Sequence, residues 1–134
     1  MKIVADTNIL IGSIFWNGPP YKIVQQALNK EIEIFTLKHI LNEVRKVLTD
    51  PKEKFQLSEQ EIEDIIKGIS LYARPVYPKT VPDVVKRDKK DNPIIACALE
   101  ARAKYIITRD NDLLTIKEYN GIKIITPEEF IKNK

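Results

Sequence analysis

Four carboxylates, Asp6, Glu43, Asp91 and Asp110, stand at the ends of predicted strands or on the helices next to them. If they converge, each like-charged pair costs about 4 kcal/mol at ~4 Å and an effective dielectric of ~20, so the cluster requires cations. Oxygen ligands without paired His or Cys favour Mg²⁺ or Mn²⁺ over Zn²⁺. Such a site typically performs phosphoryl transfer, in which the metal activates a water and neutralises charge on the phosphate.

Two of these acids follow short apolar segments, as is typical of the central strands of a parallel sheet. Asp6 comes after residues 3–5, and Asp110 comes after a strand predicted over 105–108. Adjacent parallel strands would bring both carboxylates to one edge of the sheet. That edge is where open α/β sheets bind ligands.

The other two acids belong to predicted helices. Glu43 borders the apolar stripe of a helix over 37–49, which follows a strand over 32–36. Asp91 opens a helix that runs to about residue 103, and the proline near its start suits a first helical turn. Each acid therefore lies at a chain reversal next to a central element.

Each acid also has an ordinary structural interpretation. Asp6, Asp91 and Asp110 stand before helical segments and could serve as N-caps. Glu43, taken alone, would be a surface residue of an amphipathic helix. Convergence at one sheet edge is what favours a site over four separate structural roles.

Three other residues compete for places in such a site. Asp112 could replace or assist Asp110, because both follow the same strand. Asp88 could join Asp91, or it could pair with a neighbouring lysine. His39 is the only histidine and has no partner ligand in sight, so we expect it at the surface or on the substrate side.

The whole pattern predicts an open, mainly parallel α/β sheet with helices on both faces. Thr36 is expected to cap the helix that follows it. The remaining expected elements are helices over 8–15, 20–29, 58–73 and 127–131, helical turns within 51–57 and at 113–114, an edge strand at 76–77 and a last strand over 122–125.

Size and composition indicate one globular domain over residues 1–134. The chain is 43% hydrophobic and 31% charged, with a net charge of +3. No apolar run approaches the ~18 residues of a membrane span. The N-terminus has the pattern of a strand and not of an export signal, and Cys97 is the only cysteine. We therefore expect a cytoplasmic protein without membrane association.

Other nucleotide and phosphate chemistries fit poorly. A dinucleotide-binding domain would have a glycine-rich turn after the first strand, and this chain has none. An aspartyl-phosphate phosphatase would have a second aspartate at position 8, where this chain has Asn8. A receiver domain would have its phosphorylated aspartate on a third strand, and none is evident.

Four segments, taken in order, resemble the motifs of the PIN-domain nucleases. The segments are Asp6-Thr7-Asn8, Leu41-Asn42-Glu43-Val44, residues 90–98 and residues 107–114. The turn at 16–20 and the ending at 124–130 are also similar to that family, so the resemblance covers nearly the whole chain. Among subfamilies, the chain is most similar to the toxin components of prokaryotic toxin–antitoxin pairs.

This resemblance implies a three-layer α/β/α PIN-like fold and a metal-dependent endoribonuclease. The four acids would hold one or two Mg²⁺ or Mn²⁺ ions. Asn8 and Thr108 would orient the acids or meet the substrate, and Asp88 is a further candidate for such a role. Attack of water on a backbone phosphate of single-stranded RNA would leave a 5′-phosphate and a 3′-hydroxyl.

The resemblance also implies partners. A homodimer formed through the early helices and a small protein antitoxin are expected, and Trp16 would stack on a base or lie in the dimer interface. Basic groups could hold RNA phosphates or neutralise the acids instead; they are Lys38, Arg87, Lys89, Lys90 and Arg109. The alternative function is a PIN-like RNA-binding module, or an RNA-processing nuclease without a toxin role.

Overall fold

A computed structural model describes residues 1–87 and 89–133 and contains one six-stranded sheet. The strands lie in the order β3-β2-β1-β4-β6-β5, and every neighbouring pair is parallel except β5 with β6. Their bounds are β1 (Lys2–Ala5), β2 (Glu33–Thr36), β3 (Ala73–Pro75), β4 (Tyr105–Ile107), β5 (Glu118–Tyr119) and β6 (Ile122–Ile125). The prediction of an open, mainly parallel sheet is confirmed.

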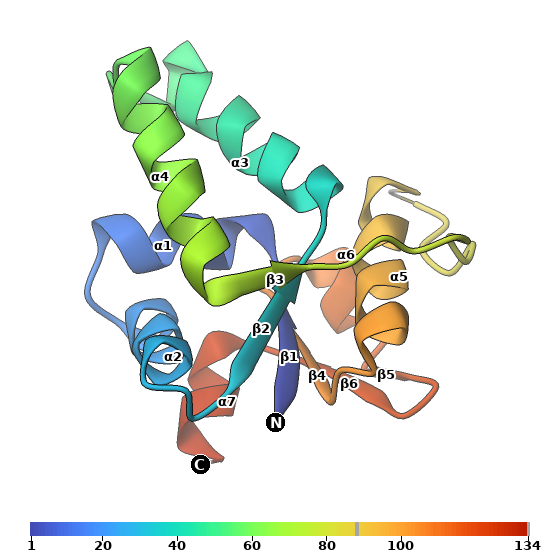
Figure 1. The fold of residues 1–134 in the computed structure, drawn as a ribbon. Coiled ribbons are helices and arrows are strands. Elements are labelled where there is room, and N and C mark those ends of the chain that lie inside the picture. The colour runs from blue at the N-terminus through green and yellow to red at the C-terminus, as the bar shows by residue number, and fades with distance from the viewer. Residues whose placement is uncertain (88, 134) are drawn as a thin grey trace.

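Helices cover both faces of this sheet, so the three-layer α/β/α arrangement is also confirmed (Figure 1). On one face α5 packs against β1, β2 and β4, while α1, α2 and α7 lie on the other. The pair α3 and α4 extends beyond the carboxyl ends of the strands. The helices are α1 (Thr7–Phe15), α2 (Pro19–Leu28), α3 (Lys38–Thr49), α4 (Glu59–Tyr72), α5 (Asn92–Ala101), α6 (Asn111–Leu114) and α7 (Pro127–Lys132).

The central strands are apolar because helices cover them on both sides. Ile3, Val4 and Ile107 are fully buried at the middle of the sheet. Ala5 of β1 pairs with Ile107 of β4, so the residues after these two strands are neighbours at one edge. No helix among the described residues is long and apolar enough to cross a membrane.

The edge strand predicted at Val76–Tyr77 is wrong in position. The strand is β3, three residues earlier, and it pairs in parallel with β2. Helix α4 ends at Tyr72, and Ala73 both ends that helix and begins the strand. The backbone N–H of Val76 donates to the Thr36 carbonyl at 2.9 Å, so the backbone pairing with β2 extends to Val76, the first residue of the predicted strand.

One other local prediction is wrong, another is confirmed, and one strand was not predicted. Leu37, not Thr36, is the N-cap of α3, because the buried Thr36 still belongs to β2. The helical turn predicted within 51–57 is present as a 3₁₀ turn, η1 (Pro51–Glu53), which is followed by left-handed backbone at Lys54 and Gln56. Strand β5, which forms a hairpin with β6, was not predicted.

Candidate metal centre

A cavity of about 310 Å³ opens at the carboxyl ends of the strands, and all four predicted acids line it. The cavity lies between the start of α1, one face of α3 and the start of α5. Its lining consists of Asp6, Thr7, Asn8, His39, Glu43, Val47, Lys90, Asp91, Ile94, Arg109 and Asp110. The sheet order therefore brings together carboxylates that lie far apart in the sequence.

Asp6 is both a helix cap and a lining residue of this cavity. Its Oδ1 accepts a hydrogen bond from the backbone N–H of Thr7 at 2.7 Å, which caps α1. Its Oδ2 accepts from the hydroxyl of Thr108 at 2.8 Å. Only 9% of the residue is exposed, so two hydrogen bonds hold a mostly buried carboxyl in one orientation.

Thr108 links the ends of the two central strands. Its fully buried hydroxyl donates to Asp6 and accepts from the backbone N–H of Asp110 at 3.0 Å. One side chain thus sets the position of Asp6 relative to the backbone of Asp110. Residues in such bridging positions orient the ligands of metal sites.

Among the residues that the structure describes, one close group of acids consists of Asp91, Asp110 and Asp112. One carboxylate oxygen from each lies within 4.8 Å of the others. The Oδ1 of Asp110 also accepts from the backbone N–H of Asp112 at 2.9 Å and thereby caps α6. Asp112 stands at the rim, because the described lining of the cavity includes Asp110 but not Asp112.

Asp6 and Glu43 face the same cavity from the side of α1 and α3. Neither belongs to the close group of acids among the described residues. Glu43 lines the cavity together with His39 and Val47, which are four residues before and after it on the same face of α3. The acids therefore surround the cavity and are not gathered at a single point.

The predicted basic and polar residues divide into two sets. Asn8, Lys90 and Arg109 line the cavity, whereas the described lining does not include Lys38, Arg87 and Lys89. Asp88 lies outside the described residues.

The two arginines near the acids already have carboxylate partners. Arg109 pairs with Glu128, and Arg87 lies 3.9 Å from Asp112. Both arginines are at least half exposed in these pairs, so they can exchange a carboxylate for another anion.

Two apolar lining residues, Val47 and Ile94, were not identified from the sequence. Their spacing offered a signal. Val47 follows Glu43 by one helical turn, and Ile94 follows Asp91 by three residues. These side chains give the cavity a partly apolar wall, which strengthens electrostatic interactions within it.

The donor set suits a hard divalent cation. The acids offer only carboxylate oxygens as ligands, and His39 is the only histidine in the chain. Burial raises the pKa of Asp6, and the nearby Asp110 raises it further, although hydrogen bonds from Thr108 and Thr7 oppose the shift. Without a cation, the charged form of Asp6 is therefore disfavoured.

The raised pKa of Asp6 predicts a pH effect on the metal-free protein. The native state holds the Asp6 proton more tightly than the unfolded state does, so wild-type stability falls as the pH rises through this pKa. An Asp6→Asn protein cannot lose that proton. In EDTA, its free energy of unfolding should therefore rise relative to wild type between pH 4 and pH 7, as measured by urea denaturation. A difference that is constant with pH would contradict the shift.

Comparison with known protein families identifies the family of this chain. A family model described as "PIN domain" matches residues 2–112. The matched region contains all four acids that line the cavity, as well as Thr108 and Asp112. No curated protein matches the chain significantly.

Proposed function

The chain belongs to the PIN-domain family of nucleases, and we propose that it is a metal-dependent endoribonuclease that cleaves single-stranded RNA. The convergence of Asp6, Glu43, Asp91 and Asp110 around one cavity supports this proposal most strongly. Asp91, Asp110 and Asp112, whose carboxylate oxygens lie within 4.8 Å of one another, repel each other unless a cation lies among them. A cavity of this kind suits a divalent ion together with one phosphate of a nucleic acid.

In this proposal the four acids hold one or two Mg²⁺ or Mn²⁺ ions, and Asp112 assists from the rim. When bound, the ion activates water and neutralises charge that develops on the phosphate. Thr108 keeps the carboxylate of Asp6 turned toward the cavity. No residue of the chain is required as a nucleophile.

The remaining lining residues would bind the substrate. Asn8, Lys90 and Arg109 can each donate hydrogen bonds to phosphate oxygens beside the acids. Lys38, Arg87 and Lys89 would contact phosphates further along the strand. His39 faces the cavity next to Glu43, so it belongs to the substrate side in this proposal.

The biological role follows from the resemblance of the motifs. We propose a toxin of a toxin–antitoxin pair, which acts in the cytoplasm as a homodimer and is restrained by a small protein antitoxin. Co-expression with the product of a short neighbouring open reading frame tests this role. Growth arrest by the chain alone and relief by that product are expected, and the absence of arrest would contradict it.

Cleavage of a 5′-labelled single-stranded RNA tests the enzymatic proposal. We expect products with 5′-phosphate and 3′-hydroxyl ends in Mg²⁺ or Mn²⁺ and none in excess EDTA. The metal alone should also raise the melting temperature, because a ligand at 100 times its Kd stabilises the native state by about 2.7 kcal/mol. Undiminished cleavage in EDTA would overturn the metal mechanism. RNA binding without turnover in any metal would instead indicate an RNA-binding module.

A further inference from the structure

Three aromatic side chains form a cluster at the far end of α1. The ring of Phe15 lies 4.7 Å from that of Phe55 and 6.0 Å from that of Trp16, measured between centroids. Trp16 meets Phe15 edge-on and is 62% exposed. A large ring that is held at its edge and left open to solvent is unusual for a side chain that only fills a core.

This aromatic cluster lies at the opposite end of α1 from the acidic cavity. Asn8 lines the cavity, and Phe15 is seven residues later on the same side of α1. Helix α3 packs against α1 and carries His39, Glu43 and Val47, which all line the cavity. Just beyond α3 the chain reaches Phe55, which packs on Phe15.

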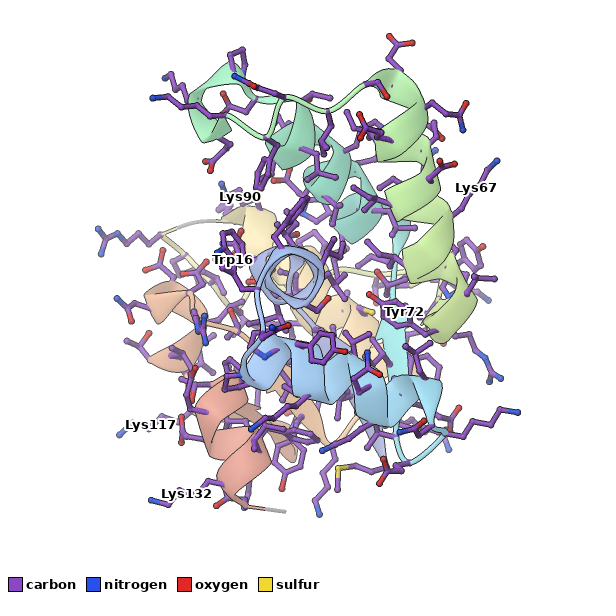
Figure 2. The ribbon with its side chains drawn as sticks, turned by 90° about the vertical axis from the view of Figure 1, so that its left-hand side faces the viewer. Trp16, Lys67, Tyr72, Lys90, Lys117 and Lys132 are labelled. Atoms are coloured by element: carbon purple, nitrogen blue, oxygen red, sulfur yellow. The ribbon has the colours of Figure 1, made fainter. Side chains whose placement is uncertain are left out.

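The direction and distance of the aromatic cluster from the cavity suit a bound strand of RNA. Figure 2 views α1 end-on, and Trp16 lies on the side of this helix toward Lys90, which itself lines the cavity. Trp16 follows Asp6 by ten residues, or about 15 Å along a helix. If an RNA strand has one phosphate among the acids, a base that lies a few nucleotides along that strand would be beside Trp16.

We propose that the aromatic cluster of Phe15, Trp16 and Phe55 is a stacking platform for nucleobases of the single-stranded substrate. This inference rests on the proposed function and extends the substrate site beyond the cavity. Single-strand binding proteins combine charged contacts to phosphates with aromatic rings that accept any base, because every base has a π-face. Here the charged contacts lie at the start of α1, and the aromatic contacts lie at its end.

A second copy of the chain is the rival occupant of this surface. A stable dimer buries about 1,000 Å² or more in total. The two exposed rings of the cluster by themselves offer only a few hundred Å², since a whole aromatic side chain buries about 150–250 Å². A dimer interface here would also have to bury neighbouring exposed side chains of α1 and α2, such as Ile14 and Tyr21. The exposed ring of Trp16, at the far end of the helix that begins beside Asp6, favours a nucleobase.

Fluorescence reports on this platform directly, because Trp16 is the only tryptophan of the chain. The Glu43→Gln variant is expected to cleave RNA slowly in Mn²⁺, so it can be titrated with a uridine oligonucleotide. Binding is measured separately by the fluorescence anisotropy of a labelled RNA. We expect quenching of the tryptophan emission by the oligonucleotide. An abasic oligomer with the same number of phosphates should leave the emission unchanged.

Substitutions then measure the contribution of stacking. Trp16→Ala should raise the KM for a long RNA about fivefold or more without changing kcat, because stacking contributes about 1–3 kcal/mol per base. Trp16→Phe should restore most of the affinity. The matched control is Tyr77→Ala, which removes another aromatic residue, 77% exposed and outside the cluster.

The outcomes separate the two proposals. RNA that binds without changing the emission, or an unchanged KM in Trp16→Ala, would overturn the platform and leave the nuclease proposal intact. Tryptophan emission that changes with protein concentration but not with added RNA would place Trp16 in a dimer interface and also overturn the platform. If wild type neither binds nor cleaves RNA in Mg²⁺ or Mn²⁺, the proposed function fails and the platform fails with it.

Discussion

Replacing Asp6 by asparagine is expected to reduce RNA cleavage by about a hundredfold or more, because loss of a metal ligand costs at least as much as loss of a residue that orients one. The fold should survive the change. Asparagine caps helices as well as aspartate does, and its amide oxygen can still accept from the Thr7 backbone N–H. The substitution therefore removes a charge facing the cavity and keeps the cap.

Two measurements on this variant separate a catalytic defect from misfolding. The first is kcat for a single-stranded RNA in Mn²⁺, and the second is the rise in melting temperature when Mn²⁺ is added, which should shrink or vanish. Asp50→Asn is the matched control, since Asp50 is also an N-cap aspartate but lies outside the cavity. Full cleavage by the Asp6→Asn protein would exclude Asp6 as a ligand, and an equal loss in the control would indicate a general effect.

Replacing Thr108 by valine is expected to impair both stability and catalysis. Valine has nearly the same shape, but it cannot donate to Asp6 or accept from the Asp110 backbone N–H. Because Thr108 is fully buried, these groups lose their partner away from solvent, at a cost of about 1–3 kcal/mol for each unsatisfied group. Cleavage should fall by about 10–100-fold, as it does for residues that orient metal ligands.

A pH profile tests whether Thr108 acts through Asp6. The hydrogen bond from Thr108 lowers the pKa of Asp6, in opposition to burial, so its loss should raise that pKa further. Stabilisation by Mn²⁺ should then begin at a higher pH in Thr108→Val than in wild type. Thr108→Ser keeps the hydroxyl and should restore the wild-type profile, and a profile that is unchanged in the valine variant would show that Thr108 has only a structural role.

Elements with strong local signals were predicted correctly. The helix predicted over 58–73 is α4, and its start carries a capping box, in which Ser58 and Glu61 each accept from the other's backbone N–H. The apolar segments before Asp6 and Asp110 are β1 and β4 as expected. Such signals involve residues a few positions apart, so they can be read from the chain alone.

Elements that depend on distant partners were placed less well. Strand β3 starts at Ala73 because that residue pairs with Ile34 of β2, and no local pattern marks the register. The end of β2 at Thr36 depends on the same pairing. The missed hairpin of β5 and β6 did have a local signal, since Asn120-Gly121 with positive φ at both residues is the preferred two-residue turn.

By itself, the sequence determined which residues could do chemistry and which strands would carry two of them. It left open whether Asp6 and Asp110 were caps or members of a site. The tertiary structure shows that each of them is a cap and also lines the shared cavity, because one oxygen of each accepts from a helix N-terminus while the side chain faces the cavity. Only the parallel pairing of β1 with β4 and the packing of α3 and α5 bring the acids together. Convergence is a property of long-range contacts, and the spacing of residues along a chain does not encode it directly.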